Sequence, residues 1–346
     1  MEFVANYGLF LAKSITLLVV FLFAVIGLLA LSSKGRKEPE GHIEIEVLND
    51  KYNDIEDAMK RALLSEEQFK DIEKQEKKQR KKAKKNKKSA DEEAKKRVFV
   101  LNFDGDVKAS AVENLREEIT AVLTMATPKD EVVLCLESPG GMVHTYGLAS
   151  SQLERITKKD IPLTVAVDAV AASGGYMMAC IGSKIIAAPF AIIGSIGVVA
   201  QLPNFHRLLK KNDVDYEMFT AGEYKRTVTM FGENSDKGRE KFVEELEDTH
   251  ELFKSFVSRH RPQVNIAEVA TGEIWYGSRA IECNLVDDLQ TSDEYLMSLR
   301  DNADMYAVSY EHKKSLQEKL GIAAAVATDS VLGKVFSRFR QERFYQ

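Results

Sequence analysis

The sequence predicts an α/β domain that follows an N-terminal transmembrane helix. From residue 98 onward, apolar runs of strand length alternate with longer segments whose apolar residues recur at helical spacing. This pattern is typical of α/β layers with parallel strand pairing. Residues 14–33 contain no charged side chain, and a helix of that length, at about 1.5 Å per residue, covers roughly 30 Å of hydrocarbon. These two observations define the class of the chain.

A cleaved signal peptide is the competing interpretation of residues 14–33. Its apolar region is usually only about 7–15 residues long and is followed by a small-x-small cleavage site, which Ala30-Leu31-Ser32 matches poorly. We therefore expect an uncleaved anchor over residues 1–33, with membrane lipid as a partner. More positive charges follow the apolar run than precede it, which favours a cytoplasmic domain under the positive-inside rule.

Residues 34–97 are expected to form a solvated, partly helical stalk. Between Lys74 and Lys88, 10 of 15 residues are Lys or Arg. A basic run of this kind is either a solvated spacer or an arm for anionic lipid headgroups or nucleic acid. No aromatic residue is interleaved with the lysines, so stacking on bases has no support, and we expect no nucleic-acid partner.

The globular domain is expected over residues 98–305, followed by an amphipathic C-terminal tail over residues 306–346. The stretch 181–202 is apolar, but Gly and Pro interrupt it, so we assign it to the core and not to a second membrane span. Expected strands are 98–103, 131–137, 163–168, 184–189 and 215–220, and expected helices are 111–125, 143–157 and 236–261.

Composition excludes several classes of protein. The chain has 346 residues and a formal net charge of −5, which is unlike a uniformly basic nucleic-acid binder. Its three cysteines match no disulfide or zinc spacing. Its six histidines form no HxxxH or HxxEH pair, and no GxGxxG or P-loop motif opens a helix. We therefore expect neither a metal nor a cofactor.

Four clusters of small residues are the candidate chemistry. They are SPGG at 138–141, AASGGY at 171–176, GSIG at 194–197 and AGEYKR at 221–226. A serine at the start of a helix after a strand, as expected at Ser173, is accessible to a substrate. It is also close to free backbone N–H groups, which favour an oxyanion. The alternative is structural: Ser173 caps the helix and the glycines permit close packing.

In this order, the four motifs resemble those of the SppA/SohB family of membrane-anchored serine–lysine peptidases, most closely its SohB branch. The resemblance extends over essentially the whole chain. It implies a ClpP/crotonase-like superhelix of βαβ units and peptide or protein substrates, such as membrane-proximal, signal-peptide or misfolded chains. It also implies a closed homo-oligomeric ring, of eight subunits or, as the second choice, four, in which an adjacent chain builds part of the substrate groove.

The resemblance assigns roles to individual residues. Ser173 matches the nucleophile, Lys225 the general base, and Ser195 the serine that orients the lysine ammonium. A serine hydroxyl needs a base to become a nucleophile. A free lysine is charged at neutral pH, so an apolar surrounding is required for it to act as that base.

The oxyanion hole is expected from the backbone N–H of Gly174 together with that of Gly140 or Gly141. One departure from the family appears near the end of the domain, where Asn284 stands in place of the usual glycine before Leu-Val-Asp. Asn is the non-glycine residue that best adopts a left-handed backbone, so we expect the turn to be kept.

Three questions stay open at this level. A crotonase-type acyl-thioester enzyme shares the implied fold, and a non-catalytic membrane scaffold shares the implied domain. The bacterial inner membrane is the expected location, but family resemblance favours the periplasmic face and the flanking charges favour the cytoplasmic face. The C-terminal segment 330–344 has apolar residues at helical spacing among basic ones, which is typical either of an interfacial helix or of a helix packed on its own domain.

Overall fold

The computed structural model describes residues 6–10, 13–14, 16–17, 41–72, 74–75, 78 and 95–312. The expected anchor over 14–33, the Lys-rich run over 74–88 and the tail beyond residue 312 lie wholly or mostly outside them. Among the described residues, no helix combines the length and apolar character needed to cross a bilayer. Residues 43–311 form one compact unit.

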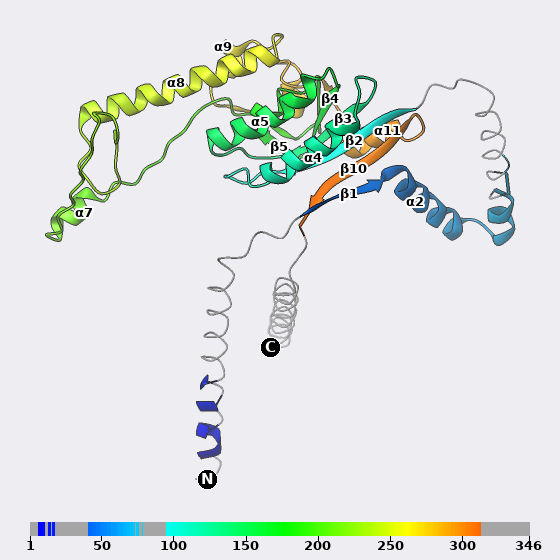
Figure 1. Ribbon diagram of the computed structural model, residues 1–346, viewed down its shortest axis with the longest axis horizontal. Helices are drawn as coiled ribbons and strands as arrows, with labels where there is room; N and C mark the ends of the chain where they lie inside the picture. Colours follow the sequence, from blue (N-terminus) through cyan, green and yellow to red (C-terminus); the bar gives the residue numbers. More distant parts are fainter. Residues whose placement is uncertain are drawn as a thin grey trace, which may run out of the picture. The chain divides into compact units, whose positions relative to one another are not determined.

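A seven-stranded sheet forms the centre of this unit (Figure 1), in the order β1-β10-β2-β3-β4-β6-β9. All pairings from β10 to β9 are parallel, as expected for strands joined by helical crossovers. A second sheet has the order β5-β7-β8. The strands are β1 (His42–Val47), β2 (Lys96–Asp104), β3 (Glu131–Glu137), β4 (Leu163–Val167), β5 (Val170–Ala172), β6 (Lys184–Ala187), β7 (Ile192–Gly194), β8 (Ile274–Tyr276), β9 (Asp288–Leu289) and β10 (Ala303–Glu311).

Helices lie against both faces of the central sheet. Along β2, Phe99, Leu101 and Phe103 face a core that includes residues of α4 and α5. The alternate residues Val98 and Val100 face a second core shared with α2 and α11. This alternation is the two-residue period of a strand buried on both faces. The helices are α2 (Leu48–Leu63), α4 (Val112–Met125), α5 (Val143–Thr157), α6 (Gly174–Ala179), α7 (His206–Lys211), α8 (Asp236–His260), α9 (Ile266–Val269), α10 (Gly277–Ala280) and α11 (Ser292–Leu299).

The compact unit is longer at both ends than the sequence indicated. β1 and α2 come from the segment expected to be a stalk, and β10 extends past the expected boundary at residue 305. Asn49 ties α2 to β10: its amide nitrogen donates to the carbonyls of Arg300 and Ala303, both at 3.0 Å, and its amide oxygen accepts from the Met305 N–H at 2.7 Å. These contacts are long-range, so local composition carried no sign of them.

The prediction of a strand at 215–220 is wrong. Those residues lie in an extended, exposed arm, residues 198–235, that leads to α8 and contains α7. No residue of the arm is buried, and Phe219 is 89% exposed. The arm is held by its own contacts: the rings of Phe205 and Tyr216 lie about 6 Å from that of Phe231. In the part of the chain that the structure describes, no strand pairs with the apolar residues of 215–220, so their alternation does not form a strand.

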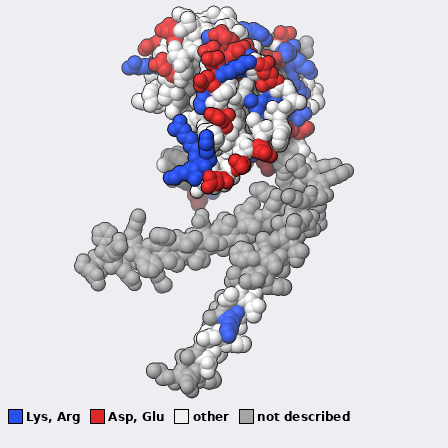
Figure 2. All heavy atoms as spheres, turned by 90° about the vertical axis from the view of Figure 1, so that its left-hand side faces the viewer, with Lys and Arg blue, Asp and Glu red and all other residues white. Residues whose placement is uncertain are grey.

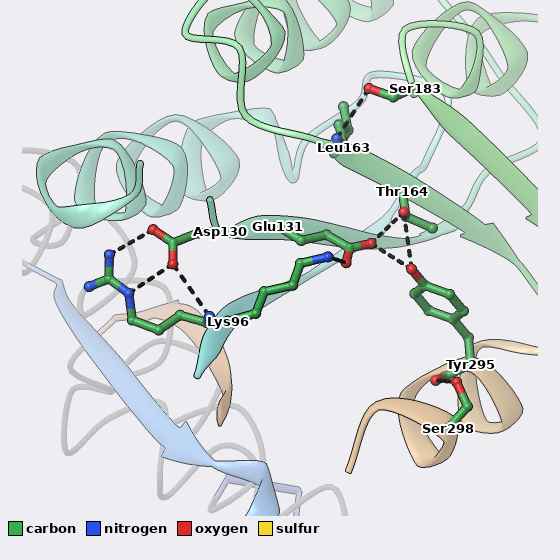
Figure 3. Close-up of polar contacts among 9 residues, drawn as sticks. Lys96, Asp130, Glu131, Leu163, Thr164, Ser183, Tyr295 and Ser298 are labelled. Atoms are coloured by element: carbon green, nitrogen blue, oxygen red, sulfur yellow. Dashed lines mark hydrogen bonds and ion pairs between the residues drawn. The ribbon is translucent and has the colours of Figure 1, made fainter. Parts of the chain in front are cut away.

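A cluster of polar side chains lies at the amino ends of β2, β3 and β4 (Figure 3). Glu131 is buried and binds the Lys96 ammonium at 2.6 Å, and it accepts from Thr164 and Tyr295. The neighbouring Asp130 accepts two bonds from the Arg97 guanidinium, at 2.9 and 2.6 Å, and two from Thr127. Burial raises the pKa of Asp130, but the bonds from Arg97 and Thr127 outweigh it and hold that pKa at about 2.

This carboxylate makes the unit sensitive to acid. The pKa of Asp130 lies below its unfolded value of about 3.9, so its stabilisation is present above pH 4 and is lost as pH falls towards 2. We expect Asp130→Asn to lower the free energy of unfolding at pH 6 by on the order of 2 kcal/mol, with the difference shrinking towards pH 2. Urea unfolding of the full chain at both pH values measures this. A difference that does not change with pH contradicts the prediction.

Candidate active site

Strand pairing brings the first three small-residue motifs together. β5 and β7 are parallel, with Ala172 opposite Gly194, so Ser173 and Ser195 leave the two strands side by side. The Ser173 N–H donates to the Gly194 carbonyl at 2.7 Å. The SPGG turn joins them because Ser138 forms a parallel bridge with Ala171. Segments far apart in sequence therefore meet at the carboxyl ends of adjacent strands, where α/β proteins commonly place their sites.

Ser173 has a strained backbone at the start of α6. Its φ of 51° and ψ of −117° fall outside the regions that side-chain-bearing residues ordinarily adopt. Its carbonyl accepts the Met177 N–H at 2.9 Å, so it caps a helix that begins at Gly174. Such strain costs about 1–3 kcal/mol and persists where the surroundings impose it, characteristically at functional sites. Among the described residues, its hydroxyl makes no hydrogen bond, and the residue is half-buried.

Glycines allow the turns to approach this closely. Gly140 has a φ of +87°, and a Cβ there would lie 2.7 Å from the Ala172 carbonyl oxygen and 2.8 Å from the Ser173 Cβ. A Cβ on Gly174 would lie 2.4 Å from the ring of Tyr146. Both approaches are too short for any side chain, so the small residues of the motifs are a packing requirement of this site.

The two candidate turn donors for the oxyanion hole differ in position. Gly140 lies against Ser173, whereas a Cβ on Gly141 would meet the Val107 carbonyl at 2.1 Å, which places Gly141 against the neighbouring loop. The Gly140 N–H already donates to the Ser138 hydroxyl at 3.1 Å. Gly174 is the first residue of α6, so its N–H has no acceptor within the helix.

Ser195 shares the strain of Ser173. Its φ is 52°, and its N–H donates to the Glu273 carbonyl at 2.7 Å. The segment that follows is held by His250 of α8, whose Nε2 lies 3.1 Å from the Ile196 carbonyl oxygen. The contacts of His250 and Glu273 with this segment could not be predicted from the sequence, because each involves a main-chain group and leaves no local sequence pattern.

Lys225 is not brought to Ser173 within this chain. It lies on an exposed turn of the arm, beside Glu223 and Tyr224, which contact Lys237 and Lys241 near the start of α8. The GSIG segment meets the same helix at His250. These two contact points are about 9 to 13 residues apart, which at 1.5 Å per residue separates them by roughly 14–20 Å. In Figure 1, α7 and the start of α8 lie away from α5 and β4.

The chemistry that the site holds is therefore a strained, accessible serine with backbone donors beside it. Among the described residues, no group of three or more His, Cys, Asp or Glu side chains is placed to bind a metal ion.

The turn predicted at Asn284, the single departure from the family, does form: Asn284 has a φ of 59°. Its carbonyl accepts from the buried Arg261, which also forms an ion pair with the partly exposed Asp287.

The sequence is similar to that of known proteins over nearly the full chain. Residues 2–153 match the model for the N-terminal region of peptidase family S49, and residues 155–306 match the model for peptidase family S49. The "Probable protease SohB" of Haemophilus influenzae is 48% identical, with 99% of each chain covered. The chain belongs to the SohB/SppA family of peptidases. The resemblance seen in its motifs is confirmed.

A second curated relative and a solved structure are also similar to this chain. The "Probable protease SohB" of Buchnera aphidicola subsp. Acyrthosiphon pisum is 46% identical, with 97% of this chain and 98% of that protein covered. Among solved structures, a mutant of the 1510-N membrane-bound stomatin-specific protease in complex with a substrate peptide is similar, at 14% identity and a TM-score of 0.40. That match covers 66% of this chain and 97% of the other. As a member of a peptidase family, this chain has peptides or proteins as its substrates.

The packing of the site predicts opposite effects for two glycine substitutions. We expect Gly140→Ala to lower the free energy of unfolding by more than about 1 kcal/mol, because it adds a side chain at positive φ and against backbone. Gly147→Ala, in α5, meets nothing within 4 Å and is expected to stabilise the chain by up to about 1 kcal/mol. Chemical denaturation measures both. Equal effects of the two substitutions would contradict the close approach at Gly140.

Proposed function

We propose that this family member is a membrane-anchored serine endopeptidase that hydrolyses peptide bonds through a Ser173–Lys225 dyad. The observation that carries the proposal is the strained Ser173 at the start of α6, beside the Gly174 N–H, which has no acceptor within the helix, and against the SPGG turn. The ClpP/crotonase-like winding expected from the motifs is supported by the parallel order of β2, β3, β4 and β6 and by the small second sheet.

The proposed reaction has two stages. The Ser173 hydroxyl attacks the peptide carbonyl while neutral Lys225 takes its proton, and the oxyanion is held by the N–H groups of Gly174 and of Gly140 or Gly141. Lys225 then gives the proton to the leaving amine, and an acyl-enzyme forms. Water attacks that ester with Lys225 again as the base, which releases the acid and restores Ser173. Ser195 is proposed to orient the lysine amine.

The separation of Lys225 from Ser173 supports a site shared between chains. The arm that carries the lysine has no buried residue and exposes Val199, Leu208 and Phe219. Figure 2 views this end of the molecule, where acidic and basic side chains are interspersed with uncharged surface. We propose that the arm packs on a neighbouring copy in a closed homo-oligomer, of eight subunits or, as the second choice, four. In it, Lys225 of one copy completes the site at Ser173 of the next.

An anchored oligomer suits membrane-proximal, signal-peptide or misfolded substrates at the bacterial inner membrane. The face of the membrane is decided by protease accessibility in spheroplasts. The two alternative functions, a non-catalytic scaffold and a crotonase-type enzyme, can be told apart from a serine peptidase. A non-catalytic scaffold does not react with a serine-directed fluorophosphonate. The activity of a crotonase-type enzyme does not depend on a Ser–Lys pair.

The dyad predicts a specific pattern of mutant effects. We expect Ser173→Ala and Lys225→Ala each to abolish peptide cleavage and fluorophosphonate labelling without unfolding the chain, and the double variant to be no worse, because residues that act as a unit are not additive. Arg226→Ala, at the neighbouring position, is the matched control and is expected to keep activity. Near-wild-type turnover by Lys225→Ala would show that another group is the base.

A shared site predicts complementation between two inactive chains. When Ser173→Ala and Lys225→Ala proteins are co-assembled, a site that combines Ser173 of one copy with Lys225 of another is intact. We expect co-expression in one membrane to restore roughly a quarter of wild-type activity, as random pairing of two chains gives. Mixed detergent-solubilised oligomers that stay inactive, while wild-type chains treated alike stay active, would indicate a dyad within one chain.

A further inference from the structure

A chain of buried hydrogen bonds lies directly behind the SPGG turn. The Tyr146 hydroxyl is 2.7 Å from the Asp106 carbonyl oxygen and 2.6 Å from the Ser138 hydroxyl, and the Ser138 oxygen is 3.1 Å from the Gly140 nitrogen. Both Ser138 and Tyr146 are 0% exposed. The chain thus connects the loop after β2, helix α5 and the turn that touches Ser173.

The direction of this chain follows from proton counting. The Asp106 carbonyl only accepts, so the single Tyr146 proton points to it. The Ser138 proton must then point to the Tyr146 oxygen, and the Ser138 oxygen accepts the Gly140 N–H. Burial raises the pKa of Tyr146, so the phenol keeps its proton. Each donor has one acceptor, and the chain has a single orientation.

The surroundings hold this chain in one place. A Cβ on Gly105 would lie 2.5 Å from the Ser138 hydroxyl and 2.6 Å from that of Tyr146, so the absence of a side chain there leaves room for the hydroxyl pair. The loop that carries the terminal acceptor is ordered by the Asp106 carboxylate, which accepts from the N–H groups of Lys108 and Ser110. The ring of Tyr146 packs on Gly174, the other proposed oxyanion donor.

We propose that Ser138 and Tyr146 are positioning residues that set the spacing between the SPGG turn and Gly174 at the oxyanion hole. The inference rests on the proposed function, since it assigns a role at that site. Through one side chain, Tyr146 fixes both partners: its hydroxyl holds the SPGG turn through Ser138, and its ring fixes the start of α6. Donors aimed at a developing oxyanion stabilise it only when they are held in place beforehand.

The test uses the full-length protein in detergent and three variants. Tyr146→Phe keeps the ring on Gly174 and removes the hydroxyl that links Ser138 to the Asp106 carbonyl. Ser138→Ala removes the acceptor of the Gly140 N–H. Tyr295→Phe is the matched control, because it also deletes a tyrosine hydroxyl bonded at 2.6 Å, to Glu131 on the other face of the sheet. The measurements are kcat and KM on a peptide, the Ki of a peptide boronate, whose tetrahedral adduct mimics the oxyanion, and the Tm.

We expect Tyr146→Phe and Ser138→Ala to lower kcat about tenfold or more, with KM within about twofold, and to raise the boronate Ki by a similar factor. Tyr295→Phe is expected to lower Tm with kcat unchanged. A fall in Tm without a change in kcat or Ki for Tyr146→Phe overturns the positioning role. So does a higher kcat for Ser138→Ala, because Ser138 would then compete with the oxyanion. If Tyr146→Phe does not fold, Ser138→Ala decides. A folded wild type that neither cleaves peptide nor binds the boronate instead overturns the proposed function.

Discussion

The close approach of three glycine-containing turns at the carboxyl ends of β3, β5 and β7 is the constraint on which the rest of the site depends. A parallel bridge at Ser138 and the pairing of Ala172 with Gly194 draw these turns together. A Cβ at Gly140 or Gly174 would collide with backbone or ring atoms. The positive φ of Ser173 is sustained because its neighbours leave the backbone no other path.

The scaffold around that point is arranged to resist relaxation. The parallel sheet is buried on both faces, and Tyr146 and Tyr176 each send a buried hydroxyl to a backbone carbonyl, of Asp106 and Leu285 respectively. Arg261, itself buried, links the end of α8 to the turn through a hydrogen bond to the Asn284 carbonyl and an ion pair with Asp287. A strained serine costs folding free energy, and these buried contacts are what oppose its release.

The arm has the opposite character. It is packed by a few aromatic rings and by Asn204, whose side chain bonds to the carbonyls of Thr229 and Gly232. It leaves large apolar side chains exposed. Removing apolar side chains of this size from water lowers the free energy of the system. Under the proposed shared site, one surface serves two needs: it joins copies of the chain and carries the lysine that each copy lacks beside its own Ser173.

By itself, the sequence determined the elements whose signal is local. The apolar runs predicted as strands at 131–137 and 184–189 and the helices predicted at 111–125 and 143–157 correspond to β3, β6, α4 and α5, with β6 ending at Ala187 and α4 beginning at Val112, since strand and helix periods are set by consecutive residues. The four motifs identified the family, and Asn284 was correctly expected to keep a left-handed turn.

Only the tertiary structure decided what depends on distant partners. β1 and α2 belong to the domain through contacts such as those of Asn49, and residues 215–220 are not in a sheet because none of the described strands pairs with them. The roles of Tyr146 and His250 depend on main-chain partners at Asp106 and Ile196. The segments that carry Lys225 and Ser195 contact α8 at different points, Lys237 and His250. Periodicity reports which face of an element is apolar, whereas contacts between segments far apart in sequence are fixed only by how the chain packs.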